Sequence, residues 1–282
     1  MSVIQPNKTS LEFADENAFF YTPLNGFNKI ELYDYQKDLL KTLDDNRFIM
    51  VRHSRQMGIS TLLKLYLANA VINTYEKPKT FMLLTPNLSL GYEFLKEVKR
   101  LIMQCDPSKI IVDNKRKLEL RNGNQIMVCS DSPTSFVSYE YDEIIIDGGN
   151  HVNNLENIIA CVTHRLGIDG KIILTSSNSK NNTFFKKLFG DESNQFIKKR
   201  ITWDLHPNRG KEWYDDMSKH ITKEDLEIEL DLIDYVEVVE PIKKTISLRI
   251  DLDLVKKMSL KLLDKDISLS EYIRNLIEKD LG

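Results

Sequence analysis

Short, uninterrupted apolar runs alternate with amphipathic stretches over most of this chain. The runs have the length of buried strands and lie within 48–51, 80–85, 143–147 and 171–177, and a last strand is expected at 196–202. Apolar residues recur at helical spacing at 33–43, 62–71, 89–104 and 153–164, and in two segments within 203–232. Strands that alternate with helices in this way predict a mostly parallel sheet flanked by helices. The expected fold class is therefore α/β.

Local signals refine this pattern. Asn122-Gly123 lies between strand-like segments at 118–120 and 125–128, which predicts a β-hairpin. Ser89 and Thr222 are expected to cap the helices that follow them. Residues 1–30 are spotted with aromatic side chains and lack periodicity, so we expect an irregular strap across the main domain.

The pattern changes after residue 232. Residues 233–242 are acidic, rich in β-branched side chains and interrupted by Pro241, which is typical of a linker. Apolar and polar residues then alternate over 245–250, and two short amphipathic segments follow within 252–277. One strand and two short helices bury too little apolar surface to fold alone. Residues 243–282 are therefore expected to form a small module that pairs with a second copy.

Composition places the chain among ordinary globular proteins. Of its 282 residues, 41% are hydrophobic and 29% are charged, and the net charge of −3 excludes a uniformly basic coat but not a local basic patch. No apolar run approaches the ~18 residues that span a membrane, and the N-terminus has no signal-peptide form. Neither the histidines nor the cysteines have metal-ligand spacing, so we expect buried thiols in a reducing cytosol.

The segment after the first predicted strand has the pattern of a phosphate-binding loop that leads into a helix. Its residues are Ser54, Arg55, Gln56, Met57, Gly58, Ile59, Ser60 and Thr61. Backbone N–H groups in such a loop, and at the N-terminus of the helix, bind phosphate. The position after Gly58, where a lysine normally contacts the β- and γ-phosphates, is Ile59. The sequence therefore has the loop pattern of an ATP site but lacks the lysine that supplies its main positive charge.

Two later strands end in polar residues that extend this pattern. The run 143–147 ends in Asp147, as does the strand that positions Mg²⁺ in ATPases, but the acid that should follow is replaced by Gly148. The run 171–177 ends in hydroxyl residues, as a coupling strand does: Thr175, Ser176 and Ser177. Carboxyl ends of parallel strands share one edge of the sheet, where ligands bind. We expect all three segments to line one crevice.

With these motifs, residues 31–232 resemble the ATPase domain of the large terminase subunit of tailed phages, the P-loop motor that packages DNA. The resemblance is carried, in the family's order, by Tyr35-Gln36, the Ser-Arg-Gln-x-Gly loop at 54–58, the hairpin, Ser132-Pro133, Trp203 and Trp213-Tyr214. It implies that Gln36 contacts adenine, that Arg55 reaches a phosphate, and that Ser60 with Asp147 holds Mg²⁺.

The chain departs from that family at residues of the catalytic machinery. The motor has lysine at the position of Ile59 and glutamate at that of Gly148, and each loss slows phosphoryl transfer by orders of magnitude. We expect residues 243–282 to stand in the place of the family's nuclease domain. Ile59 is expected to place a branched side chain in the phosphate space. We therefore expect a pseudo-ATPase that binds ATP or ADP with Mg²⁺ weakly or not at all, ATP losing more affinity than ADP.

Residues 243–282 resemble the ribbon-helix-helix DNA-binding family of the Arc and MetJ repressors. The alternating strand and the Ser268-Leu269-Ser270-Glu271 helix start carry this resemblance. It implies a homodimer, or a higher even-numbered oligomer, whose antiparallel ribbon enters the major groove of double-stranded DNA. The DNA-contacting residues that it implies are Lys243, Lys244, Thr245, Ser247, Arg249 and Ser270. The alternative is a surface strand that packs on the main domain.

The sequence thus predicts a DNA-binding phage protein in the cytoplasm of an infected bacterium, which acts in DNA packaging or phage gene regulation. Its terminase-like domain would serve as a scaffold or would bind partners such as terminase or portal proteins. The enzymatic alternative is a surviving ATPase or translocase. In that case the missing lysine would be replaced by Lys64, one helical turn after Ser60, or by a residue of a neighbouring subunit. The missing glutamate would be replaced by Glu156 or another acid.

Overall fold

The computed structural model describes residues 8–22, 26–74, 76–132, 135, 140–167, 169–179 and 183–230. All of them belong to one unit of the chain, Met1–Asp234. The predicted linker 233–242 and the ribbon-helix-helix segment 243–282 lie outside the described residues, so both stay predictions. In the described ranges no helix has the length and apolar character needed to cross a membrane.

Eight strands form the central sheet, in the order β10-β3-β9-β8-β4-β7-β6-β5. The first six are parallel: β10 (Ile197–Ile201), β3 (Phe48–His53), β9 (Lys171–Ser177), β8 (Glu143–Asp147), β4 (Thr80–Leu84) and β7 (Gln125–Cys129). Two antiparallel strands, β6 (Lys117–Leu120) and β5 (Ile110–Asp113), extend one edge. The predicted α/β class and its mostly parallel sheet are confirmed, although β5 was not expected.

Strand β9 lies between β3 and β8, although it follows both of them in the sequence. Its register aligns Thr175 with Val51 of β3 on one side and with Asp147 of β8 on the other. The loop after β3 and the end of β8 therefore stand two strand spacings apart. Both are at the carboxyl edge, where open α/β sheets bind ligands.

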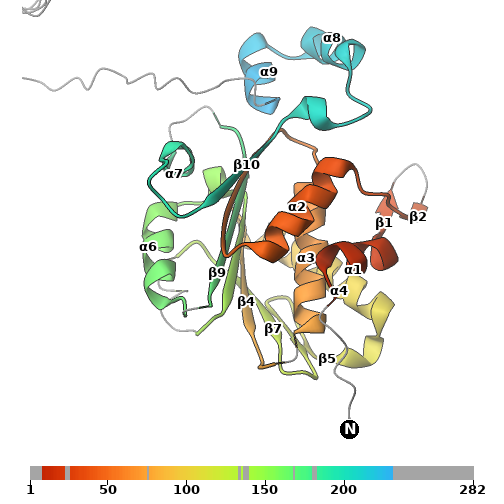
Figure 1. The fold of residues 1–282 in the computed structure, drawn as a ribbon, viewed down its shortest axis with the longest axis vertical. Coiled ribbons are helices and arrows are strands. Elements are labelled where there is room, and N and C mark those ends of the chain that lie inside the picture. Colours follow the sequence, from red (N-terminus) through yellow and green to blue (C-terminus); the bar gives the residue numbers. More distant parts are fainter. Residues whose placement is uncertain are drawn as a thin grey trace, which may run out of the picture. The chain divides into compact units, whose positions relative to one another are not determined.

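Helices cover both faces of the sheet. On one face are α2 (Asp34–Asp45), α3 (Ile59–Asn73) and α4 (Leu88–Cys105), and on the other are α6 (Leu155–Arg165) and α7 (Phe184–Gly190) (Figure 1). Side chains along a strand alternate between faces. Ile49 and Val51 therefore enter the core under α3, whereas Met50 enters the core under α6 and α7. A sheet covered on both faces requires the uninterrupted apolar runs seen in the sequence.

The expectation that residues 1–30 are irregular is wrong for the described part of that segment. Helix α1 (Ser10–Asn17) is followed by β1 (Phe19–Thr22) and β2 (Gly26–Lys29), which pair antiparallel. Thr9 and Glu12 form a reciprocal capping box at the start of α1, which is a signal for helix initiation that the sequence contains. Phe13 is buried in the core that also holds α2 and α3, so α1 is an integral part of this face.

The last described segment lies at the carboxyl end of the sheet. After β10 come the 3-10 turn η3 (Trp203–Leu205), α8 (Lys211–His220) and α9 (Lys223–Glu229), which lie beyond the end of β10 in Figure 1. Thr222 caps α9 as predicted, because its hydroxyl accepts a hydrogen bond from the Asp225 N–H. The predicted cap at Ser89 is wrong. Helix α4 starts earlier, and Asn87 accepts the hydrogen bond from the Leu90 N–H.

The predicted hairpin is formed by β6 and β7, and a buried side chain fixes it to α3. Asn124 donates from Nδ2 to the carbonyl oxygens of Val71 at 2.9 Å and Thr74 at 2.8 Å. Its Oδ1 accepts from the Lys79 N–H at 2.7 Å. The two bonds from Nδ2 satisfy carbonyl groups that the end of α3 leaves without helical partners.

We expect Asn124→Ala to lower the free energy of unfolding by about 2–4 kcal/mol, because three backbone groups lose a hydrogen bond to a fully buried side chain. Urea denaturation followed by circular dichroism measures this change. Asn208→Ala, at an exposed turn, is the matched control and should stay within about 0.5 kcal/mol of the parent protein. Equal losses in the two variants would contradict the role given to Asn124.

Candidate functional site

The loop that follows β3 is tied to the end of α9. Ser54 is fully buried, its hydroxyl donates to the Leu230 carbonyl at 2.7 Å, and its N–H donates to the Ile201 carbonyl at 2.9 Å. The Arg55 N–H donates to the Glu229 carbonyl at 3.0 Å, and its guanidinium pairs with the Glu229 carboxylate at 3.0 Å. Two of the predicted phosphate-loop residues are thus engaged by a segment far away in the sequence.

The backbone of the loop is left-handed at two positions, Gln56 with φ 59° and Gly58 with φ 75°. Glycine is needed at position 58, since a Cβ there would lie 2.7 Å from Nε2 of Gln36. This close approach brings the Gln36 side chain against the loop.

Gln36 and Tyr35 brace the loop from α2. The Gln36 Nε2 donates to the Met57 carbonyl at 3.2 Å, and its Oε1 accepts from the Tyr33 N–H at 3.0 Å. The Tyr35 hydroxyl donates to the same Met57 oxygen at 3.0 Å. Burial raises the pKa of Tyr35 to about 12, so this hydroxyl remains a donor at neutral pH. The amide that the family resemblance assigns to adenine is used here to hold the loop.

Arg209, which no sequence pattern indicated, also holds the loop. Its guanidinium donates to the carbonyl oxygens of Arg55 and Gln56, each at 3.1 Å. It also lies over the Trp213 ring, 4.6 Å from the centroid, and Trp213 stacks on Trp203. The planar fork of an arginine directs two N–H groups at two carbonyl oxygens in a fixed geometry.

Three of the predicted residues meet directly at the carboxyl edge. The Asp147 carboxylate accepts from the Ser60 hydroxyl at 2.6 Å with one oxygen and from the Thr175 hydroxyl at 2.9 Å with the other. These residues come from α3, β8 and β9, so the expected convergence of loop helix, acidic strand and coupling strand is present. Thr61 lies beside Ser60 in the first turn of α3.

The residue after Asp147 is a glycine in left-handed backbone. Gly148 has φ 90°, and its N–H donates to the Thr175 carbonyl at 2.9 Å. A Cβ at this position would lie 2.9 Å from Cγ of Pro86. Any side chain, glutamate included, would be strained in this conformation and would collide with the proline ring.

The expectation that Ile59 fills the phosphate space is wrong. Its side chain is 2% exposed and belongs to the apolar core under α3, where Met57 is also buried. The first residue of α3 is therefore used for packing. The loop lacks a lysine, but no branched side chain projects from position 59 into the open space at its surface.

A cavity of about 390 Å³ opens beside Asp147, between α3, α4 and the ends of β3, β4, β8 and β9. Ser60, Asp147 and Ser177 are the predicted residues on its wall. Charge is added by Lys64 of α3 and by Glu93 and Glu97 of α4. The two glutamates were missed in the sequence, although their i, i+4 spacing after β4 places both on one helix face.

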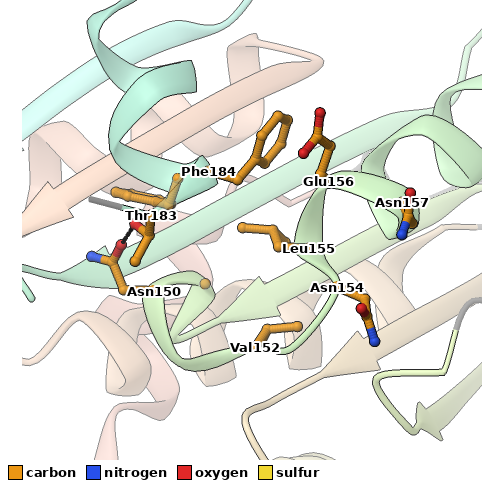
Figure 2. A pocket seen from close by; sticks show the side chains of 10 residues that line it. Asn150, Val152, Asn154, Leu155, Glu156, Asn157, Thr183 and Phe184 are labelled. Carbon is orange, nitrogen blue, oxygen red and sulfur yellow. Dashed lines mark hydrogen bonds between the residues drawn. The ribbon is translucent and has the colours of Figure 1, made fainter. Parts of the chain in front are cut away.

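A second cavity, of about 290 Å³, lies between η2 (Gly149–His151), α6 and α7 (Figure 2). Glu156, the acid suggested as a replacement for the missing glutamate, lies here and not on the wall of the cavity beside Asp147. Asn150 links this cavity to β9. Its N–H donates to the Ser176 hydroxyl at 2.9 Å and its side chain to the Ser177 carbonyl at 2.5 Å, while the Thr183 hydroxyl donates to the Asn150 side chain.

Within the part of the chain that the structure describes, no three acidic, histidine or cysteine side chains converge as a complete metal site. Ser60 and Asp147 therefore offer only a partial set of oxygen ligands. This fits Mg²⁺ brought by a nucleotide, because Mg²⁺ takes most of its ligands from water and phosphate and few from protein.

No protein-family profile matches the chain. Among solved structures it is similar to the ATPase domain of the large terminase of Thermus phage P74-26, with a TM-score of 0.55 and 16% identity over 71% of this chain and 93% of that one. The large terminase of a thermophilic bacteriophage in complex with ADP gives a TM-score of 0.58 and 12% identity over 72% and 53%. The large terminase of bacteriophage HK97 gives 0.55 and 12% over 78% and 50%.

This likeness establishes the fold that the motifs implied, that of the large-terminase ATPase domain. The chain spans about half the length of the last two terminases. The predicted DNA-contacting residues lie outside the described residues, and their role stays a prediction: Lys243, Lys244, Thr245, Ser247, Arg249 and Ser270.

We expect Arg209→Met to loosen the loop, because two carbonyl groups lose a charged donor. Amide hydrogen exchange should become faster at 55–58, and the free energy of unfolding should fall by about 1–3 kcal/mol. Arg116→Met is the control, since Arg116 lies in the turn between β5 and β6 and donates a hydrogen bond to the Tyr92 hydroxyl. Unchanged exchange in the loop, or the same change in both variants, would show that Arg209 does not hold it.

Proposed function

We propose that this chain is a phage DNA-packaging protein whose terminase-like domain binds a nucleotide without hydrolysing it, and whose C-terminal segment binds DNA. The observation that carries the first part is the pair of hydrogen bonds from Ser60 and Thr175 to Asp147, beside a cavity at the carboxyl edge of the sheet. A terminase-like fold with this arrangement supports a site for a phosphorylated ligand.

The residues present fit a Mg²⁺-nucleotide. Backbone N–H groups of the Gly58 loop and the N-terminus of α3 would hold the phosphates. Ser60 and Asp147 would hold the magnesium, directly or through water, and the ion would neutralise phosphate charge. None of these interactions depends on the side chain at position 59.

Two features argue against hydrolysis. The position that follows Asp147 is a glycine in left-handed backbone against Pro86, so it supplies no carboxylate to orient a water molecule, and a side chain placed there would be strained. The position of the loop lysine is an isoleucine that packs in the core. Both catalytic contributions are missing from their usual places, and each is worth orders of magnitude in rate.

The proposal for DNA rests on the sequence pattern of residues 243–282. A ribbon-helix-helix dimer would place Thr245, Ser247 and Arg249 against base edges, and Lys243, Lys244 and Ser270 near phosphates. The terminase-like domain would then be carried to DNA in pairs, in the cytoplasm of the infected bacterium. Its setting is DNA packaging or phage gene regulation, and terminase or portal proteins are the partners to test.

A second candidate, an active ATPase, is favoured by one observation. The cavity beside Asp147 holds an ammonium, from Lys64, and two further carboxylates, from Glu93 and Glu97. Phosphoryl transfer needs groups of these types. Here they are on helices α3 and α4, whereas the usual lysine and glutamate would be in the loop and directly after β8. Hydrolysis would then proceed with a rearranged set of residues.

A phosphate-release assay with ATP, Mg²⁺ and duplex DNA separates the two candidates. We expect the full chain to release phosphate no faster than Asp147→Ala, because neither a water-orienting acid nor a loop lysine is in place. Asp169→Ala, at an exposed position away from the cavity, controls for nonspecific effects. DNA-stimulated hydrolysis that Asp147→Ala abolishes and Asp169→Ala keeps would establish the active ATPase instead.

Gel-shift titration at low salt tests the DNA-binding segment. The full chain should bind duplex DNA as a dimer, and a chain that ends at Asp234 should lose specific binding. Arg249→Ala should weaken binding by about 1–3 kcal/mol if this residue reads a base, whereas Lys41→Ala on α2 should have no effect. A monomer that ignores DNA, or a truncated chain that binds as well as the full one, would rule out this part of the proposal.

A further inference from the structure

We propose that Lys64 takes the place of the missing loop lysine and binds the terminal phosphate of a Mg²⁺-nucleoside triphosphate in the cavity beside Asp147. This inference rests on the proposed function, since it requires the proposed nucleotide site. Within that site, Lys64 would be the side chain that distinguishes a triphosphate from a diphosphate.

Lys64 is placed on the right face of α3. It follows Ser60 by four residues, so the two side chains share one face and lie about 6 Å apart along the helix. Long helical side chains lean back toward the N-terminus. The ammonium is therefore carried back toward Ser60 and Asp147, and all three residues line the same cavity.

The Lys64 ammonium has no polar partner in the part of the chain that the structure describes. Its contact is the ring of Phe94, 5.4 Å from Nζ, and it makes neither a hydrogen bond nor an ion pair there. Three N–H donors are thus available to a ligand. A cation held in a cavity without a hydrogen-bond acceptor is costly, so the hydrogen bonds of the described residues do not account for it.

The electrostatic surroundings of Lys64 connect it to the magnesium end of the site. Burial lowers the pKa of Lys64, while the carboxylates of Glu97, Asp147 and Glu93 act in the opposite direction. Asp147 is the residue that the Ser60 hydroxyl contacts. The Lys64 ammonium interacts electrostatically with Asp147 and lines the same cavity. It is therefore near the place where the last phosphate of a nucleotide would lie.

The charge of the cavity sets what it accepts. One positive charge, from Lys64, faces three negative ones, from Glu93, Glu97 and Asp147, which gives a formal balance of −2. Arg100 and Lys96 pair with Glu97 and Glu93 at 3.0 and 3.2 Å and offset part of this excess. A bare phosphate anion is repelled by such a wall. A phosphate that carries Mg²⁺ is not, so binding should require the divalent cation.

This assignment reverses the expectation that ATP loses more affinity than ADP. That expectation rested on the lost ammonium of the loop lysine and, in addition, on the bulk of Ile59, whose side chain packs in the core. With Lys64 at the far end of the site, the third phosphate gains a cation and the triphosphate is favoured.

Calorimetric titration of the full chain with ATP, ADP and AMP, with and without Mg²⁺, tests the inference. Lys64→Met keeps the packing against Phe94 and removes the charge. We expect it to weaken Mg²⁺-ATP binding roughly tenfold or more, as the loss of charge-assisted hydrogen bonds predicts, and to leave AMP unchanged. Lys64→Arg should retain most of the affinity, and Lys41→Met, at an exposed site on α2, should retain all of it.

The outcomes are distinct. If the parent protein binds Mg²⁺-ATP and both Lys64→Met and Lys64→Gln bind it equally well, the assignment of Lys64 is overturned while the nucleotide site stands. The same holds if ATP and ADP weaken by the same factor, since a purely structural role would affect both. If the parent protein binds no nucleotide at millimolar concentration, the proposed site and the role of Lys64 both fail. Melting temperatures of all variants identify any that do not fold.

Discussion

The two hydrogen bonds to the Asp147 carboxylate connect the parts of this molecule on which the site depends. One oxygen accepts from Ser60 at the start of α3 and the other from Thr175 of β9, while the Gly148 N–H returns a bond to the Thr175 carbonyl. This arrangement requires β9 to lie between β3 and β8, as the strand order has it. A change in that order would separate the loop helix from the acidic strand, and the cavity beside Asp147 would lose its wall.

The strands and long helices could be predicted from sequence because each has an apolar run or a full period of its own. The segments that were missed are short or depend on polar signals. Helix α1 begins with a capping box at Thr9 and Glu12 that was overlooked, and α4 is capped by Asn87 one residue before its first helical residue. Strand β5 and helix α7 are four and seven residues long, too short for periodicity to identify.

For the site, the sequence located the residues but not their partners. The loop, Ser60, Asp147 and Thr175 follow from motifs that each occupy a few consecutive positions. The Arg209 clamp on the loop joins residues more than 150 positions apart, and nothing local encodes it. The backbone angle of Gly148 and the inward packing of Ile59 depend on tertiary neighbours in the same way. The Ile59 side chain does not enter the phosphate space, because its direction is set by the core residues that it packs against.

A polar residue retained at a degenerate site can have either of two explanations, and the contacts of each residue decide between them. Both carboxylate oxygens of Asp147 are used to join α3, β8 and β9, so its presence is explained by the fold even without catalysis. Gln36 is explained likewise by the Met57 and Tyr33 bonds of its amide. Lys64 makes no such hydrogen bond, because its ammonium faces a cavity with an aromatic ring as its contact and carboxylates acting on it only through their charge. Lys64 therefore supports a ligand in this domain by an observation separate from the hydrogen bonds of Asp147 beside the same cavity.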